Sequence, residues 1–242
     1  EWISNSVLSE FFVILVHDIR DLETGVELKE IQSSYPTNCK LVEGVFGNPG
    51  AARNAGIRIS KTPWICFWDA DDIPNVQGFR DLCIKTIAEK SNIGVGNFSQ
   101  VNLTNGKETL EKFPENFSQL LDSCVKSPGL WRFIFSRNAI SNVAFPELSM
   151  GEDAIFLLRS FDVTQQISFI DQSIYTYFQG IPNQLTSRPF KEKDLVAGLE
   201  EIHKQVLTNR QIKRFGIQLS IKFCGSIIKG KDSTNKLVAI RR

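Results

Sequence analysis

WICFWDADD, residues 64–72, joins five apolar residues directly to three carboxylates. The apolar run predicts a short buried strand, and Asp69, Asp71 and Asp72 follow at its end. Carboxylates this close repel one another, so a fold tolerates them where solvent or a cation screens them. Mg²⁺ or Mn²⁺ suits such oxygen ligands, and Mg²⁺ commonly takes one or two carboxylates plus substrate phosphates. The stretch therefore predicts a divalent-cation site. A solvated acidic turn, with Asp72 as the N-cap of the next helix, is the alternative.

Outward from this stretch, strand-like and helix-like segments alternate. Upstream lie an expected strand over residues 11–16, a helix over 22–35, a strand over 40–46 and a helix from 47 to about 59. Downstream lie a helix over 74–89 and a strand over 93–101. This order predicts the α/β class with a mainly parallel, doubly wound sheet. Because ligands bind beyond the carboxyl ends of such strands, His17-Asp18 and the Asp69–Asp72 turn are expected to share one crevice.

The second half of the chain alternates less regularly. Expected helices cover residues 117–125, 153–161, 194–207 and 212–228, with a helix or turn over 139–143. Expected strands cover residues 130–135, 167–170 and 174–178. We predict two parts: a main domain over residues 1–190 and a basic helical extension over residues 191–242.

Composition narrows the kind of site this chain can hold. Its five cysteines are odd in number, widely spaced and form no CxxC pair, which argues against a disulfide framework or a zinc site and favours a reducing compartment. There are only two histidines, so any metal is expected on oxygen ligands. No apolar run reaches the roughly 18 residues that a membrane span requires. We expect a cytoplasmic protein.

Charge is unevenly distributed along the chain. The net charge is +1, yet from Arg210 onward nine Lys and Arg face one acid, a balance of +8 that leaves −7 on the remainder. Such a basic end predicts an anionic partner. The amphipathic segment 212–231 could lie on an anionic membrane surface, or it could dock on the main domain. No nucleic-acid partner is expected.

Two further motifs carry polar groups of interest. GNPGAARNAG, residues 47–56, offers small residues for close backbone approach and Arg53 as a planar donor fork for phosphate or a base edge. GEDAIF, residues 151–156, sets Glu152 and Asp153 at the start of an apolar helix. There the two acids interact favourably with the positive end of the helix dipole, or one of them acts as a general base.

Taken together, FFVILVHD, KLVEGVFGNPGAARNAG, WICFWDADD, FPELSMGEDAIF and IYTYF resemble the inverting family-two glycosyltransferases of GT-A fold. They occur in the family's order and spacing from about residue 11 to about residue 188. The resemblance implies a GT-A sheet with a small antiparallel acceptor-side portion and C-terminal helices. It also implies transfer from a nucleotide-diphosphate sugar, UDP-sugar favoured, to a hydroxyl on a glycan or lipid-linked acceptor. Cell-surface polysaccharide or glycoconjugate synthesis is the expected setting.

The resemblance also implies roles on the donor side. Asp18 would lie near the nucleotide base, and Arg53 would help to hold the nucleotide. Asp69 and Asp71 match the family's DxD motif, with Asp69 near the ribose or the metal and Asp71 on the metal. Asp72 would support them, and Mn²⁺ or Mg²⁺ would be the cofactor.

Four more residues receive roles by the same resemblance. Asp153 matches the catalytic base, and Glu152 would support it or touch the acceptor. Trp131 falls in a segment that often lines the acceptor side. Arg188 lies in a loop expected to close over the diphosphate.

Two departures from the family pattern bear on the nucleotide pocket. The family has an earlier strand that this sequence lacks, so we expect an incomplete pocket and an exposed sheet edge. His17 stands where the family commonly has an acid, which leaves the choice of base open. A sugar-phosphate nucleotidyltransferase and a non-catalytic GT-A-like binding module are the competing readings.

Overall fold

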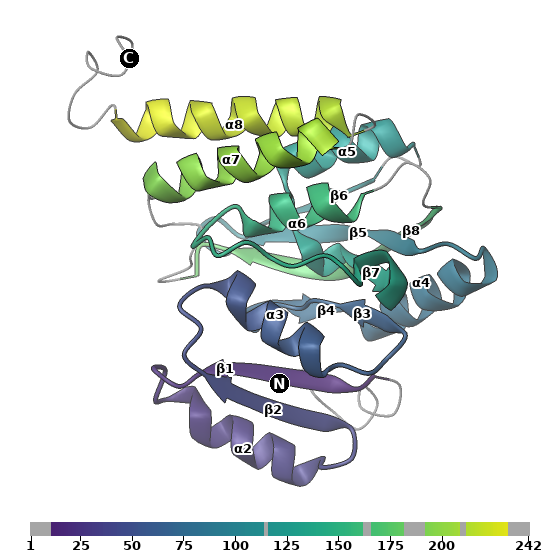
Figure 1. Ribbon diagram of the computed structural model, residues 1–242. Helices are drawn as coiled ribbons and strands as arrows, with labels where there is room; N and C mark the ends of the chain where they lie inside the picture. Colours follow the sequence, from purple (N-terminus) through teal and green to yellow (C-terminus); the bar gives the residue numbers. More distant parts are fainter. Residues whose placement is uncertain (1–10, 114–115, 162–165, 182–191, 209–211, 232–242) are drawn as a thin grey trace.

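The computed structural model describes residues 11–113, 116–161, 166–181, 192–208 and 212–231 (Figure 1). Its first half contains β1 (Val13–Asp18), α2 (Thr24–Ser34), β2 (Cys39–Gly44), α3 (Pro49–Ile59), β3 (Trp64–Cys66), β4 (Ile73–Pro74), α4 (Val76–Ala88), β5 (Ile93–Asn102) and β6 (Lys107–Glu111). Its second half contains α5 (Phe117–Lys126), β7 (Phe133–Ser136), α6 (Glu152–Ser160), β8 (Ile167–Gln179), α7 (Glu192–Thr208) and α8 (Lys213–Lys231). Every predicted strand and helix up to residue 101 is present, with ends shifted by a few residues.

The strands form two sheets. β1 and β2 pair in parallel, while the larger sheet has the order β3-β7-β5-β8-β4, with β6 on β5. In the larger sheet β5 and β8 are parallel, whereas β7 and β6 run antiparallel to β5, and β4 runs antiparallel to β8. The predicted α/β class with C-terminal helices is confirmed, and the sheet is mixed.

Three local features differ from the sequence expectation. The strand expected from residue 130 begins as a 3-10 turn, Leu130–Arg132, in which the buried Arg132 donates to the Ser127 carbonyl. The two expected strands within residues 167–178 are one strand, β8, with register shifts opposite Gly96–Phe98. The hairpin strand β6 was not predicted because its mostly exposed sequence, KETLE, shows no buried face.

The C-terminal helices pack onto the main domain. Figure 1 shows α7 and α8 side by side over α5 and α6. Their inward side chains, together with Ile212 just before α8, belong to the same hydrophobic core as α5, α6 and β7: Leu195, Ile202, Phe215, Leu219 and Phe223. The predicted boundary at residue 190 lies outside the described residues. Within the described residues, no helix has the length and apolarity to cross a membrane.

Candidate active site

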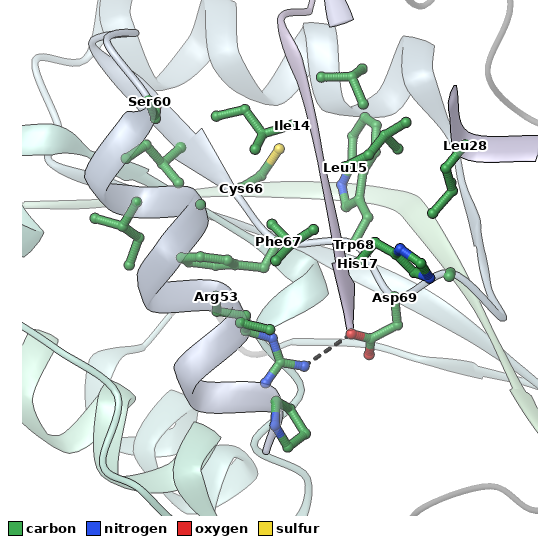
Figure 2. A pocket seen from close by; sticks show the side chains of 18 of the residues that line it. Ile14, Leu15, His17, Leu28, Arg53, Ser60, Cys66, Phe67, Trp68 and Asp69 are labelled. Carbon is green, nitrogen blue, oxygen red and sulfur yellow. Dashed lines mark hydrogen bonds and ion pairs between the residues drawn. The ribbon is translucent and has the colours of Figure 1, made fainter. Parts of the chain in front are cut away.

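Arg53 connects three carboxylates that come from distant parts of the chain. Its Nη2 lies 2.9 Å from Asp69 Oδ1, directly after β3 (Figure 2). Its Nη1 lies 2.9 Å from Glu152 Oε1 and 2.7 Å from Asp153 Oδ1, both in the first turn of α6. The structure therefore brings together the predicted nucleotide-binding arginine, the first aspartate of DxD and the predicted base.

The position of Arg53 follows from how α3 begins. Asn48 caps the helix by accepting from the Ala51 N–H at 2.8 Å, and Pro49 occupies its first turn. The next residue is Gly50, and any Cβ there would lie 2.8 Å from the Pro146 carbonyl oxygen. Glycine is thus required for α3 to approach the loop that precedes α6.

Asn54 locks α3 to that same loop. Its amide donates to the Phe145 carbonyl at 3.0 Å and accepts from the Phe145 N–H at 2.9 Å. The Phe145 ring lies 5.6 Å from the Arg53 guanidinium carbon, a cation–π distance. Two neighbouring residues of α3 therefore have separate roles: Asn54 holds the loop in place, and Arg53 contacts the carboxylates.

The start of α6 determines the electrostatics of the base. Gly151 caps the helix at φ +87°, so glycine suits this position, and Glu152 and Asp153 follow at the positive end of the helix dipole. Burial raises the pKa of Asp153 well above the usual range; Arg53 lowers this pKa, and the charges of Glu152 and Asp69 raise it. A carboxylate with a raised pKa is a stronger proton acceptor, which suits a general base.

The DADD turn separates its three carboxylates. Asp69 faces Arg53 and its backbone N–H donates to the Tyr175 hydroxyl at 3.0 Å. Asp71 is exposed. Asp72 is buried, and its Oδ1 accepts from the Phe178 N–H at 2.8 Å. The alternative reading of Asp72 as an N-cap is wrong, because Asn75 caps α4.

Asp72 carries an unusual charge environment. Burial raises its pKa to about 7; the Phe178 N–H lowers this pKa, and the Asp69 and Asp71 charges raise it. Its Oδ2 is buried, and the Tyr175 hydroxyl also lowers the Asp72 pKa. Asp72 therefore anchors the turn to β8.

Trp131 lies behind this turn rather than on an open surface. It is 5% exposed and stacks on Tyr175 at 4.7 Å between ring centroids and on Tyr177 at 5.5 Å. Since Tyr175 accepts from Asp69, Trp131 supports the residue that holds the DxD backbone. Tyr175 was not predicted as a site residue, although the IYTYF motif contains it.

Asp18 fixes the end of β1 to the loop that leads into α3. Its Oδ2 accepts from the Phe46 and Gly47 N–H groups at 3.0 and 3.3 Å, and its Oδ1 pairs with Arg20 Nε at 2.7 Å. The Arg20 side chain, with help from these backbone donors, holds the pKa of Asp18 well below its usual range. Arg20 was not singled out from the sequence.

A cavity of about 490 Å³ lies between β1 and β3 and carries Asp18, Arg53 and Asp69 on its lining (Figure 2). His17 also lines it; the His17 side chain is buried, with Nε2 2.8 Å from the Asp21 carbonyl oxygen. The predicted convergence of the two strand ends on one crevice is thus observed. Arg188 lies outside the described residues.

Asp69 and Asp71 could hold a metal ion only together with water and the phosphates of a bound substrate. Among the described residues, no three His, Cys, Asp or Glu side chains gather as a ready metal cage. Asp69 and Asp71 nevertheless offer hard oxygen donors from one turn, and the buried Asp72 is not needed as a third. This donor set fits Mg²⁺ or Mn²⁺, which completes its shell with water and substrate phosphates.

Solved structures share the fold. TarS residues 1–349 from S. aureus, crystallised with UDP-GlcNAc, superposes with a TM-score of 0.73 at 17% identity, over 95% of this chain and 68% of that one. The mannosyltransferase PcManGT from Pyrobaculum calidifontis, in complex with GDP-Man and Mn²⁺, gives a TM-score of 0.51 at 11% identity, over 90% of this chain and 64% of that one. The fold is therefore of the GT-A type.

The sequence comparison gives the family. The model of glycosyl transferase family 2 matches residues 5–161, so this chain belongs to that family. It is also 26% identical over 198 residues to EpsJ of Bacillus subtilis (strain 168), described as an uncharacterized glycosyltransferase. That match spans 76% of this chain and 57% of EpsJ, so the chain covers little more than half the length of this relative.

Proposed function

We propose that this chain moves a sugar from a nucleotide-diphosphate sugar, with UDP-sugar favoured, to an acceptor hydroxyl with inversion at the anomeric carbon. One observation carries the proposal: Arg53 holds Asp69 on one side and Asp153 on the other, at 2.9 and 2.7 Å. The predicted donor and base residues therefore lie within the span of one guanidinium. The family assignment supports the same reaction class.

Asp153 is the proposed base. Its carboxylate accepts the proton of the acceptor hydroxyl as that oxygen attacks the anomeric carbon from the face opposite the diphosphate. The carbon–oxygen bond to the diphosphate breaks in the same displacement, so one base suffices, unlike the carboxylate pair of glycoside hydrolases. The raised pKa of Asp153 favours its proton uptake. Glu152 contacts the same Nη1 nitrogen of Arg53 and so holds the guanidinium beside Asp153.

Arg53 and Asp18 serve the donor in this proposal. The guanidinium has a planar fork that matches diphosphate oxygens, so donor binding exchanges part of its carboxylate contacts for phosphate contacts. Asp18 lines the cavity and accepts from the Phe46 and Gly47 N–H groups, and the nucleotide base of the donor would lie near it. The UDP-GlcNAc of the TarS crystal structure supports uridine as the favoured nucleoside of the donor.

Asp71, together with Asp69, is the proposed ligand set for Mn²⁺ or Mg²⁺. When bound, the cation neutralises charge on the departing diphosphate as a Lewis acid. The Mn²⁺ named with GDP-Man in the PcManGT structure supports this assignment. Tyr175, through the Asp69 N–H, and Asp72, through the Phe178 N–H, hold the turn that presents both ligands.

The proposed acceptor is a glycan or lipid-linked hydroxyl in surface polysaccharide or glycoconjugate synthesis at the cytoplasmic face of a membrane. The outward face of α8 supports contact with an anionic membrane. Ile217, Ile221 and Ile228 are 46%, 67% and 62% exposed there, and Lys213 and Arg214 are exposed beside them. Replacement of the exposed Ile217 and Ile221 by Glu should release the protein from anionic vesicles; unchanged binding would overturn the membrane proposal.

A thermal-shift titration with UDP, GDP, dTDP and CMP, each with and without Mn²⁺, tests the donor site. A specific ligand stabilises the fold by RT ln(1 + [L]/Kd), so a manganese-dependent shift with one diphosphate is expected. Transfer or hydrolysis of the matching nucleotide sugar would follow. Release of pyrophosphate from a nucleoside triphosphate would favour a nucleotidyltransferase instead. Absence of any binding would favour a non-catalytic module.

A further inference from the structure

The turn formed by residues 149–151 leads directly into α6 and so into Asp153. The loop just before this turn is held by α3, through Gly50 and Asn54. The turn itself contacts α7 and α8, which lie beside α6 (Figure 1). Both helices follow residue 161, where the match to the family model ends. These contacts therefore come from outside the part of the chain that defines the family.

On the α7 side the contact with the turn is polar. Asp194, in the first turn of α7, accepts from the Ser149 N–H at 3.2 Å through Oδ2. The same oxygen also accepts from the Ser149 hydroxyl. Hydrogen bonds to a charged acceptor belong to the stronger class. One carboxylate oxygen thus fixes both the backbone and the side chain of Ser149, shortly before the helix that carries the proposed base.

On the α8 side the contact with the turn is apolar. Phe223 is 4% exposed, and its ring lies against two glycines. Any Cβ at Gly151 would lie 2.8 Å from Phe223 Cζ, and any Cβ at Gly198 of α7 would lie 2.5 Å from Phe223 Cε2. Because carbon atoms pack at roughly 3.5–4.0 Å, the ring leaves no room for a side chain at either glycine. Phe223 therefore packs directly on the backbone of the turn and of α7.

A second polar contact joins α6 to α7 at the end of α6 that is far from the base. Arg159, in the last turn of α6, pairs with Glu201 of α7 and donates to the Ala144 carbonyl. Glu201 and Asp194 thus tie α7 to the two ends of α6, yet only Asp194 acts at the end that carries Asp153. Comparison of these two acids therefore separates general helix packing from support of the turn.

The contacts of the turn matter because Asp153 must keep its position when its partner leaves. Arg53 holds Asp153 from the α3 side at 2.7 Å, and on the proposed function donor binding draws this guanidinium toward the diphosphate. A general base must lie within roughly 2.6–3.2 Å of the group whose proton it takes. A misplacement of about 1 Å costs about 10²-fold in rate. Once Arg53 turns to the donor, the contacts of α7 and α8 with the turn remain.

We infer that Asp194 and Phe223 are positioning residues for Asp153: they hold the turn at residues 149–151 so that the base stays in place in the donor complex. The inference rests on the proposed function, in which Asp153 is the base. Neither positioning residue is part of the lining of the donor cavity. Their loss should therefore lower turnover and leave donor affinity unchanged.

Kinetics of the full chain test this inference. Asp194→Ala removes the acceptor for Ser149 and should lower kcat at least about tenfold, while the Kd for UDP in Mn²⁺ stays within about twofold. Asp194→Asn keeps an acceptor oxygen and should recover at least about half of the parent kcat. Phe223→Leu removes the ring from Gly151 and should lower kcat at least about threefold. Full turnover in Asp194→Ala or in Phe223→Leu would overturn the inference, as would an equal loss of UDP affinity.

The matched control is Glu201→Ala. This variant truncates another acid of α7 and releases the far end of α6, so it should keep a kcat close to that of the parent. A loss of turnover equal to that of Asp194→Ala would show that any loosening of α7 has the same effect, and would overturn the inference.

Amide hydrogen exchange supplies a second measurement that needs no activity. At the start of α6 the Ile155 N–H bonds to the Gly151 carbonyl at 3.4 Å. At its end the Phe161 N–H bonds to the Leu157 carbonyl at 2.9 Å. Asp194→Ala should speed exchange at Ile155 at least about tenfold and leave Phe161 unchanged; equal rates at Ile155 in parent and variant would overturn the inference. A parent protein that transfers no sugar would reject the proposed function alone, because the exchange rates still decide whether Asp194 holds the turn.

Discussion

Arg53 Nη1 lies 2.7 Å from Asp153 Oδ1, although the two residues are 100 positions apart in the chain. The same guanidinium reaches Asp69 on its other nitrogen. Charge-assisted pairs of this length are the stronger class of hydrogen bond. The contact therefore defines the relative position of α3, the DADD turn and α6 before any substrate is present.

Replacement of Asp153 by Asn should lower turnover by about 10²–10⁴-fold while UDP affinity is largely kept. The amide preserves the shape of the side chain but cannot accept the proton of an acceptor hydroxyl. Initial rates with the nucleotide sugar and calorimetric titration with UDP measure the two quantities. The control is Asp122→Asn, which removes a surface pair with Arg214 at 3.1 Å. Full turnover in the Asp153 variant would exclude this residue as the base.

Replacement of Arg53 by Met should lower the free energy of unfolding by about 3 kcal/mol at pH 8. The reason is that the largely buried carboxylates of Asp69 and Glu152, 33% and 9% exposed, lose their cation. The loss should be smaller at pH 5. The Arg53 charge lowers the pKa of Asp153, so its loss raises that pKa further in the folded state. The folded protein then binds more protons than the unfolded chain, and stability falls as pH rises. Urea unfolding at both pH values measures the difference.

The control for that experiment is Arg20→Met. Arg20 is exposed and pairs with Asp18 in contact with solvent, so its loss should lower the free energy of unfolding far less than the loss of Arg53. A pH-independent loss in the Arg53 variant would indicate lost packing rather than lost charge.

Replacement of Asp72 by Asn should flatten the dependence of stability on pH. The folded pKa of Asp72 is about 7, and the unfolded value is about 3.9. An acid whose pKa is raised on folding costs nothing below the unfolded pKa and destabilises increasingly as pH rises from about 4 to about 7. The cost reaches at most about 4 kcal/mol at neutral pH. Asparagine keeps an acceptor for Phe178 N–H without the charge.

Urea unfolding between pH 4 and pH 8, in EDTA to exclude bound metal, measures this effect. The control is Asp81→Asn on α4, which carries a helix-surface hydrogen bond to Gln77. If the stability of the Asp72 variant still falls as steeply as that of the parent, the buried carboxyl does not titrate in this range.

Replacement of Tyr175 by Phe should keep the stack on Trp131 but remove the acceptor for the Asp69 N–H. The expected loss of stability is about 1 kcal/mol. Manganese-dependent UDP affinity should also fall, since the DxD turn loses a backbone anchor. The control is Tyr35→Phe at the end of α2, outside the cavity lining. Unchanged UDP affinity would show that the turn needs no such anchor.

Sequence reasoning succeeded where the signal is local. The apolar run before Asp69 predicted a buried strand with carboxylates at its end. The alternation of strand-like and helix-like segments predicted the α/β class. The turn chemistry of residues 47–56 predicted a helix that continues to about residue 59. Each of these features depends on residues only a few positions apart, so residue propensity and hydrophobic periodicity are enough to predict it.

The direction in which a polar or aromatic side chain points could not be predicted from the sequence. The acceptor-side role of Trp131 stays a prediction, and the structure shows this residue in a buried stack with Tyr175 and Tyr177. The N-cap alternative for Asp72 was wrong, because its carboxylate accepts from β8 instead. Neither direction can be read from residue type, because a turn can present the same side chain to solvent or to the core.

The sequence by itself determined most of the strands and helices up to about residue 101, the glycosyl transferase family and the carboxylates available for chemistry. Only the tertiary structure decided that Arg53 pairs with Asp153 as well as Asp69, that Tyr175 anchors the DxD turn, and that β1 and β3 line one cavity. Those relationships join residues up to about a hundred positions apart. They arise from how whole helices and sheets pack, which no local pattern of residues encodes.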